Sequence, residues 1–230
     1  MLFVGIAWQF ITWNQMNKLR FFVVLTFVIL AGGASADEAA TNLTSFRAMT
    51  WNIWHGGRED GKDVGPERVV DIIRQSKADI VAMQETYGSG QLISEALQFE
   101  FHPRGTNVSI HSRYPIVEDI SVFEEFKCVG ALVELPGGEK IAFYSLWLPY
   151  DEDIWLPRSR EKYNDQQLTS KCDVSADDLR KILKLIEQRL SDAKYDGIDL
   201  FIAGDFNSMS HLDYTDVNRD QFGHSVKWPT

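Results

Sequence analysis

The feature that most constrains the fold is an alternation of apolar strand and amphipathic helix patterns early in the chain. Residues 46 to 53 are rich in aromatic and apolar side chains, which predicts a strand. Gly65-Pro66 then opens a segment whose apolar residues recur at helical spacing, and residues 79 to 83 form a short apolar run typical of a buried strand. Strand, helix and strand in this order predict an α/β fold.

The rest of the chain continues this pattern. Residues 128 to 135 and 140 to 148 read as two strands separated by Pro136-Gly137-Gly138, which predicts a hairpin. Ser175 and Asp178 form a capping signal for an amphipathic helix that reaches Leu190, and residues 198 to 203 read as another buried strand. The polar stretch from 150 to 173 has no clear period, so we expect a long loop there.

The N-terminus has the pattern of an export signal. Lys18 and Arg20 precede an unbroken apolar run from Phe21 to Ala31, and small residues follow as Ala34-Ser35-Ala36. The run is roughly half the ~20 residues of a membrane-spanning helix, which favours a cleaved signal peptide over an anchor. We therefore expect residues 1–36 to be an upstream extension and signal peptide. The mature protein would begin at Asp37 and be exported, either secreted or periplasmic, without a stable membrane span.

The net charge bears on which molecules the protein binds, and the cysteine content bears on whether it contains a disulfide. The net charge is −10, and removing the signal peptide takes away two more positive charges. Because the chain shows no cluster of Lys and Arg, nucleic acid is a possible but disfavoured partner. The two cysteines, Cys128 and Cys172, predict either one structural disulfide or two buried thiols.

Polar side chains lie at the carboxyl ends of three of the expected strands. They are Asn52, Gln84-Glu85, and Asp205 with Asn207. Open α/β sheets bind ligands at the carboxyl ends of their strands, so these residues are candidates for a site. Taken singly, each could instead cap a turn or a helix.

Taken together, these motifs resemble those of the endonuclease/exonuclease/phosphatase superfamily over about residues 46 to 215. The family order is an Asn after one strand, Gln-Glu after the next, and Gly-Asp-Phe-Asn after a late strand, which here is residues 204–207. Residues 112–116, Ser-Arg-Tyr-Pro-Ile, are similar to a scaffold segment of the family. The sequence segments 51–57 and 204–213 resemble those of an exported branch of the family. The resemblance implies an α/β, four-layer sandwich of two mixed β-sheets flanked by helices.

The resemblance also implies a chemistry for each motif. Glu85, with Asn52 beside it, would be the principal ligand of Mg²⁺ or Mn²⁺, since hard cations prefer oxygen ligands. Asp205 would orient the attacking water, and Asn207 would donate hydrogen bonds to the reacting phosphoryl group. The expected activity is metal-dependent hydrolysis of a phosphodiester or phosphomonoester by a monomer. The expected substrate is a small molecule or a lipid headgroup.

Two departures from the family pattern affect this prediction. Trp147 stands where many relatives have a His, and an indole cannot take up a proton. The contact to the substrate phosphate would therefore pass to a neighbour such as Tyr150 or His55, or be absent. His55, Tyr150 and His211 are our candidates for substrate binding. The family's closing Asp-His pair does not occur before Thr230, so we expect residues 37–230 to be a domain that lacks its last strands.

Two other functions remain open at this point. The chain could be a non-catalytic fragment that retains a metal and phosphate cradle, which the missing Asp-His pair favours. It could also be a secreted nuclease, which would require a basic face that the sequence does not display.

Overall fold

The computed structural model describes residues 45–153 and 156–208, and it begins with the strand, helix and strand that the sequence predicts. The strands are β1 (Ala48–Asn52), β2 (Ile80–Gln84), β3 (Glu100–Arg104), β4 (Val108–Ser112), β5 (Ile116–Asp119), β6 (Cys128–Glu134), β7 (Lys140–Trp147) and β8 (Asp199–Asp205). The helices are α1 (Val64–Ser76), α2 (Gly90–Leu97), α3 (Pro157–Lys162), α4 (Asp165–Lys171) and α5 (Asp173–Arg189), with 3-10 turns η1 (His55–Gly57) and η2 (Ala193–Tyr195).

These elements fall into two compact units. Of the described residues, the first unit contains 45–147 and 189–205, which include all the strands given above. The second unit contains residues 148–188 and 206–208, and so holds α3, α4 and nearly all of α5.

The first unit is built on two mixed four-stranded sheets, which confirms the predicted α/β class with two sheets and flanking helices. One sheet has the order β1-β2-β4-β3, in which β1 and β2 are parallel and the other pairs antiparallel. The second has the order β5-β6-β7-β8, in which only β7 and β8 are parallel. The antiparallel β6–β7 pair is the predicted hairpin.

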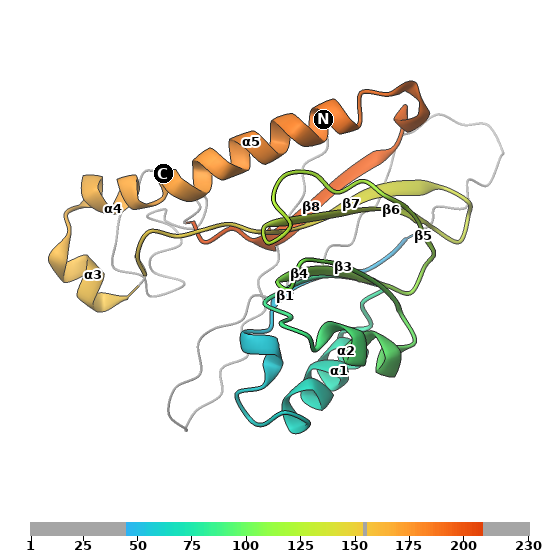
Figure 1. Cartoon of the computed structure of the whole chain (residues 1–230), viewed down its shortest axis with the longest axis horizontal. Helices are drawn as coiled ribbons and strands as arrows, with labels where there is room; N and C mark the ends of the chain where they lie inside the picture. Colours follow the sequence, from blue (N-terminus) through green and yellow to red (C-terminus); the bar gives the residue numbers. More distant parts are fainter. Residues whose placement is uncertain (1–44, 154–155, 209–230) are drawn as a thin grey trace, which may run out of the picture. The chain divides into compact units, whose positions relative to one another are not determined.

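Side-chain alternation along the strands divides the first unit into two apolar layers. In β2, Val81 and Met83 pack with α1 and α2 on one face of the first sheet, where Figure 1 shows both helices. Ile80 and Ala82 point the other way and pack with residues of β6 and β7 from the second sheet. The core between the sheets is therefore closed by strands that lie far apart in the sequence.

The polar stretch from 150 to 173 differs from the loop that we expected. It contains α3 and α4, and α4 begins with a reciprocal capping box between Asn164 and Gln167. The next helix, α5, begins at Asp173, which is earlier than predicted. Ser175 therefore lies inside the helix, and its hydroxyl donates to the Cys172 carbonyl instead of capping the N-terminus. Such short polar helices have no apolar period, which is why the sequence pattern missed them.

The structure matches one of the two cysteine alternatives. Cys128 and Cys172 are both free and buried, as the alternative of two buried thiols predicts. Burial raises the pKa of the Cys128 thiol to about 11, because a thiolate is poorly solvated in the apolar interior. Cys128 is therefore an unreactive core residue.

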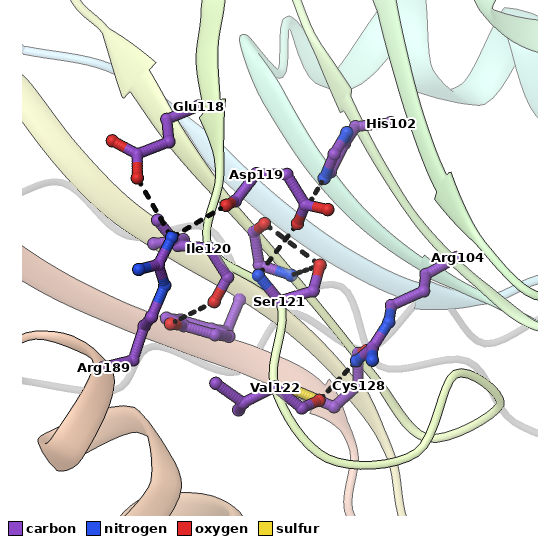
Figure 2. Close-up of polar contacts among 11 residues, drawn as sticks. His102, Arg104, Glu118, Asp119, Ile120, Ser121, Val122, Cys128 and Arg189 are labelled. Carbon is purple, nitrogen blue, oxygen red and sulfur yellow. Dashed lines mark hydrogen bonds and ion pairs between the residues drawn. The ribbon is translucent and has the colours of Figure 1, made fainter.

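A loop between β5 and β6, residues 120–127, is fastened to the first sheet by an arginine. Arg104 at the end of β3 donates to the carbonyl oxygens of Phe123 at 3.0 Å and Cys128 at 2.8 Å, and also to that of Val122. Figure 2 shows its guanidinium pointing at this loop. One side chain thus satisfies three carbonyl groups and joins the two sheets.

Residues 1–36 and His211 lie outside the described ranges, so the expectations placed on them stay predictions. None of the helices in 45–153 or 156–208 combines the length and apolar character that crossing a membrane requires.

Candidate functional site

The carboxyl ends of the parallel strands bring two of the predicted site segments, those of Asn52 and Asp205, together. In β1, Met49 and Trp51 pack toward the helices, so Asn52 at the end of the strand points to the other face, toward the second sheet. In β8, Phe201 and Ala203 pack against the core between the sheets, and Asp205 shares their face two residues later. The period of two therefore aims both polar side chains at the space where the sheets meet.

Asn52 is the centre of the resulting cluster. Its Nδ2 donates to Glu85 Oε1 at 2.9 Å and to Asp205 Oδ2 at 2.8 Å, while its Oδ1 accepts from the Trp54 N–H at 2.9 Å. A neutral amide that donates to two carboxylates reduces the repulsion between their charges. The structure thus brings together three of the four residues that the sequence predicts to be catalytic.

Glu85 is held in a conformation that its residue type adopts at a cost. It follows β2 with a left-handed φ of 56°, a region that costs non-glycine residues about 1–2 kcal/mol. Its carboxylate accepts from Asn52, and its Oε2 also accepts from the His55 N–H at 3.2 Å. Strain at one acidic residue, with both carboxylate oxygens fixed, is typical of functional positions.

The loop after β1 is shaped to make this contact. The Gly56 N–H donates to the Glu85 carbonyl at 2.7 Å, and its φ of 72° favours glycine. A Cβ at Gly56 would lie 2.8 Å from the Ser89 hydroxyl, so a larger residue would push the loop outward. The His55 ring itself turns away from Glu85 and contacts Glu59 through Nδ1 at 2.7 Å.

The donor set fits a hard divalent cation that keeps several waters. Among the residues that the structure describes, no group of three or more His, Cys, Asp or Glu side chains could hold a metal ion. A structural zinc site would need such a group, whereas Mg²⁺ binds through one or two carboxylates with water and substrate phosphate. Each Glu85 oxygen accepts one N–H bond, and a carboxylate oxygen has a second lone pair for a cation.

The remaining predicted residues belong to the second unit or lie outside the described ranges. The Asn207 amide donates to the Leu148 carbonyl at 2.8 Å, and Asn207 also has a left-handed φ, of 44°. Tyr150 is exposed. His211 lies outside the described residues, and the roles of all three stay predictions.

Trp147 lies at the end of β7, beside Asp205 at the end of the neighbouring strand β8. It pairs with Asp205 in the parallel β7–β8 register, and its ring packs at the edge of the core between the sheets. The residue that replaces the family's His is therefore a direct strand neighbour of the predicted water-orienting carboxylate.

Two buried polar residues that were not predicted, Ser145 and Asn107, support the site. The Gln84 side chain donates to the Ser145 hydroxyl at 2.9 Å and so links the two sheets beneath Glu85. Asn107, just before β4, accepts the Glu85 N–H on its Oδ1 at 2.9 Å. Neither follows a predicted strand, so the sequence signal that identified the other residues could not find them.

Five aromatic rings form a continuous series beside the cluster. Neighbouring ring centroids are 4.9, 6.4, 6.4 and 5.4 Å apart. The rings come from four separate segments, which explains why no sequence pattern indicated them. In spatial order they belong to Trp54, His55, Tyr87, Phe126 and Trp147.

Two packed mixed sheets, with carboxylates gathered where their parallel strands end, define an α/β sandwich with a polar site at one rim. The model described as the Endonuclease/Exonuclease/phosphatase family matches residues 49–228. The chain belongs to this family, whose name joins two kinds of nuclease with phosphatases. All three classes hydrolyse phosphoester bonds.

Comparison with individual proteins supports the same fold. TDP2 from Caenorhabditis elegans is 15% identical, with a TM-score of 0.50 over 70% of this chain and 48% of that structure, and its selenomethionine form gives 0.51 over 70% and 47%. The chain thus spans about half the length of these solved relatives. An uncharacterized C. elegans protein, F14F9.5, is 26% identical over 215 residues, which cover 90% of this chain and 68% of that protein.

Proposed function

We propose that this chain carries the site of an exported, Mg²⁺- or Mn²⁺-dependent phosphoester hydrolase. The observation that supports the proposal most is the Asn52 amide, which joins the Glu85 and Asp205 carboxylates within 3 Å of itself. The Glu85 carboxylate, which suits a hard cation, thereby lies next to the Asp205 carboxylate, which is suited to orient a water molecule. Family membership supports phosphoester hydrolysis as the reaction class.

The proposed roles follow from the contacts of each side chain. Glu85 would hold the cation, because its carboxylate is fixed from two sides. Asn52, predicted as a second ligand, faces Glu85 with its Nδ2 while its Oδ1 accepts from the Trp54 N–H, so it would orient the Glu85 carboxylate in this arrangement. When bound, the cation would polarise a phosphoryl oxygen and offset charge on the leaving oxygen. Asp205, oriented by Asn52, would accept a hydrogen bond from the attacking water and align it with phosphorus. Asn207 would donate to the phosphoryl oxygens.

For the substrate we propose a small phosphoester or a lipid headgroup. The net charge of −10 and the absence of a basic cluster in the sequence argue against nucleic acid, whose affinity depends on Lys and Arg contacts to phosphates. His55 and Tyr150 are the described candidates for substrate contacts, since both are exposed.

A panel of phosphoesters tests the function. Wild-type protein should hydrolyse at least one member of a set that includes bis-p-nitrophenyl phosphate, p-nitrophenyl phosphate, glycerophosphocholine and single- and double-stranded DNA. Activity should require Mg²⁺ or Mn²⁺. Asp205→Asn and Glu85→Gln should each lose at least ~100-fold in kcat, the lower end of what a positioned proton-handling group contributes.

The exposed Glu139 in the β6–β7 turn gives a matched control, because Glu139→Gln removes the same charge far from the cluster along β6 and β7. Full activity is expected in this variant. Cation binding without hydrolysis of any member would favour the non-catalytic cradle, and hydrolysis confined to DNA would favour the nuclease.

Export has its own test. Mass spectrometry of the protein recovered outside the cytoplasm should give Asp37 as the first residue, because Ala34 and Ala36 occupy the small-residue positions that signal peptidase reads. Membrane-bound material that retains Phe21 to Ala31 would show an anchor instead.

A further inference from the structure

A buried asparagine behind the site holds the backbone of Glu85. Asn107 has no exposed surface, and its Oδ1 accepts the Glu85 N–H at 2.9 Å. Its own backbone carbonyl accepts the Thr86 N–H at 3.1 Å. Asn107 therefore accepts hydrogen bonds from the backbone N–H groups of both residues that follow β2. Its Nδ2 donates to the Phe126 carbonyl at 2.8 Å. The side chain therefore uses both its acceptor and its donor group.

These bonds explain how Glu85 keeps its left-handed conformation. The chain leaves β2 at Glu85, and there its N–H bonds to the Asn107 side chain instead of to a neighbouring strand. Without that acceptor, a partly buried N–H would lose its partner, at a cost of about 1–3 kcal/mol. Relaxing φ from 56° toward the extended region would recover solvation, but it would also turn the carboxylate away from Asn52.

The Phe126 contact extends the effect of Asn107 to the second sheet. Phe126 lies in the loop that Arg104 fastens, and its ring packs edge-on against Trp147 with centroids 5.4 Å apart. Trp147 is in turn the strand partner of Asp205. One buried amide is thus bonded to the backbone of the proposed cation ligand and to the loop that packs beside the second carboxylate.

We propose that Asn107 is a positioning residue that fixes the Glu85 carboxylate for cation binding. This inference rests on the proposed function, since it assigns Glu85 to the cation. Asn107 acts through Glu85 and touches neither cation nor substrate. Residues that orient metal ligands in this way contribute about 10- to 100-fold to metal affinity.

The test compares Asn107→Ala with Ser109→Ala in the full chain. Ser109 is equally buried and lies two residues away in β4, but its hydroxyl contacts His111 and not Glu85. Mg²⁺ affinity measured by calorimetry should fall 10- to 100-fold in Asn107→Ala and stay within 2-fold of wild type in Ser109→Ala. In hydrolysis assays with saturating Mg²⁺, Asn107→Ala should lower kcat more than it raises KM. Asn107→Asp keeps the acceptor for the Glu85 N–H and should recover part of the affinity.

A second measurement needs no change at position 107, so a folding defect of the Asn107 variants cannot affect it. The side-chain amide signals of Asn107 in the ¹⁵N NMR spectrum should shift when Mg²⁺ is added to wild type. The same signals should not respond in Glu85→Gln.

The outcomes separate this inference from the proposed function. Equal Mg²⁺ affinity in Asn107→Ala and wild type, or equal losses in Asn107→Ala and Ser109→Ala, would overturn the positioning role even if phosphoesters are hydrolysed. A selective affinity loss in Asn107→Ala without hydrolysis by wild type would support positioning and contradict the hydrolase.

Discussion

His111 is a fully buried imidazole whose two nitrogens are both engaged by serine hydroxyls. Nδ1 lies 2.7 Å from Ser94 Oγ on α2, and Nε2 lies 2.8 Å from Ser109 Oγ on the same strand, β4. Burial lowers the pKa of His111 from 6.5 to about 3, because the charged ring would lose its hydration. The folded protein therefore keeps this ring neutral, while the unfolded chain takes up a proton near pH 6.5.

The sign of the resulting pH dependence follows from proton linkage. Between pH 6.5 and about 3 the unfolded state binds the extra proton, so the free energy of unfolding decreases as the pH falls through this range. The slope is about 1.4 kcal/mol per pH unit for a single group. Because the unfolded imidazole is already half protonated at pH 6.5, chemical denaturation at pH 6.5 and pH 4.5 should show a His111 contribution of roughly 2 kcal/mol, which His111→Gln should abolish.

Ser94→Ala is the control for this prediction. It removes a hydrogen-bond partner but retains the buried ring, so stability should drop equally at both pH values. If His111→Gln and wild type lose the same stability between pH 6.5 and pH 4.5, the buried neutral imidazole is not the source of the dependence.

At the scale of elements, the loop of residues 120–127 depends on one planar side chain. Arg104 donates to the carbonyls of Phe123 and Cys128, and to that of Val122, across the gap between the sheets (Figure 2). A lysine ammonium lacks the fixed fork needed to reach diverging carbonyls together. Arg104→Lys should therefore destabilise the protein by about 1–3 kcal/mol, and amide hydrogen exchange in residues 121–127 should become faster.

Arg113→Lys provides the comparison for the loop. Arg113 forms an exposed ion pair with Asp79 at 3.0 Å, a kind of contact worth about 0.2–1 kcal/mol. Its replacement should leave exchange in residues 121–127 unchanged. Unchanged exchange in Arg104→Lys as well would mean that backbone packing alone orders the loop.

The sequence predicted those elements whose own residues show a regular apolar pattern or clear Pro and Gly boundaries. β1, α1, β2 and the β6–β7 hairpin could be located because each buries one face or is bounded by Pro and Gly. The polar helices α3 and α4 could not, since both are short and have no apolar stripe; α4 begins with a side-chain capping box, whereas α3 has no side-chain cap.

The same distinction separates the site residues. Asn52, Glu85 and Asp205 were predicted because each follows a strand, where α/β sheets bind ligands. Asn107 and Ser145 contact partners 22 and 61 residues away, and such contacts depend on how strands pair and sheets pack. The aromatic series depends on tertiary structure in the same way.

At the scale of the whole first unit, the cluster joins its two sheets at one rim. Asn52 and Glu85 come from the end of the first sheet, and Asp205 from the end of the second, so the hydrogen bonds of one amide bridge the sandwich. The apolar core between the sheets lies beneath this bridge, with Ile80 and Phe143 among its members. A cation held by Glu85, whose carboxylate is connected to Asp205 through the Asn52 amide, would therefore restrain both sheets.

This arrangement predicts that Mg²⁺ stabilises the folded protein as a whole. A ligand that binds only the folded state adds about 2.7 kcal/mol at 100 times its Kd, which for a domain of this size raises Tm by roughly 5–10 °C. Thermal unfolding followed by circular dichroism should show this rise with Mg²⁺ and its reversal by EDTA. Glu85→Gln should abolish the rise, since the carboxylate fixed by Asn52 and the His55 N–H is its source. Glu139→Gln, which changes an exposed turn, should keep it. A Tm rise of equal size in Glu85→Gln would place the cation elsewhere and contradict the assignment of Glu85.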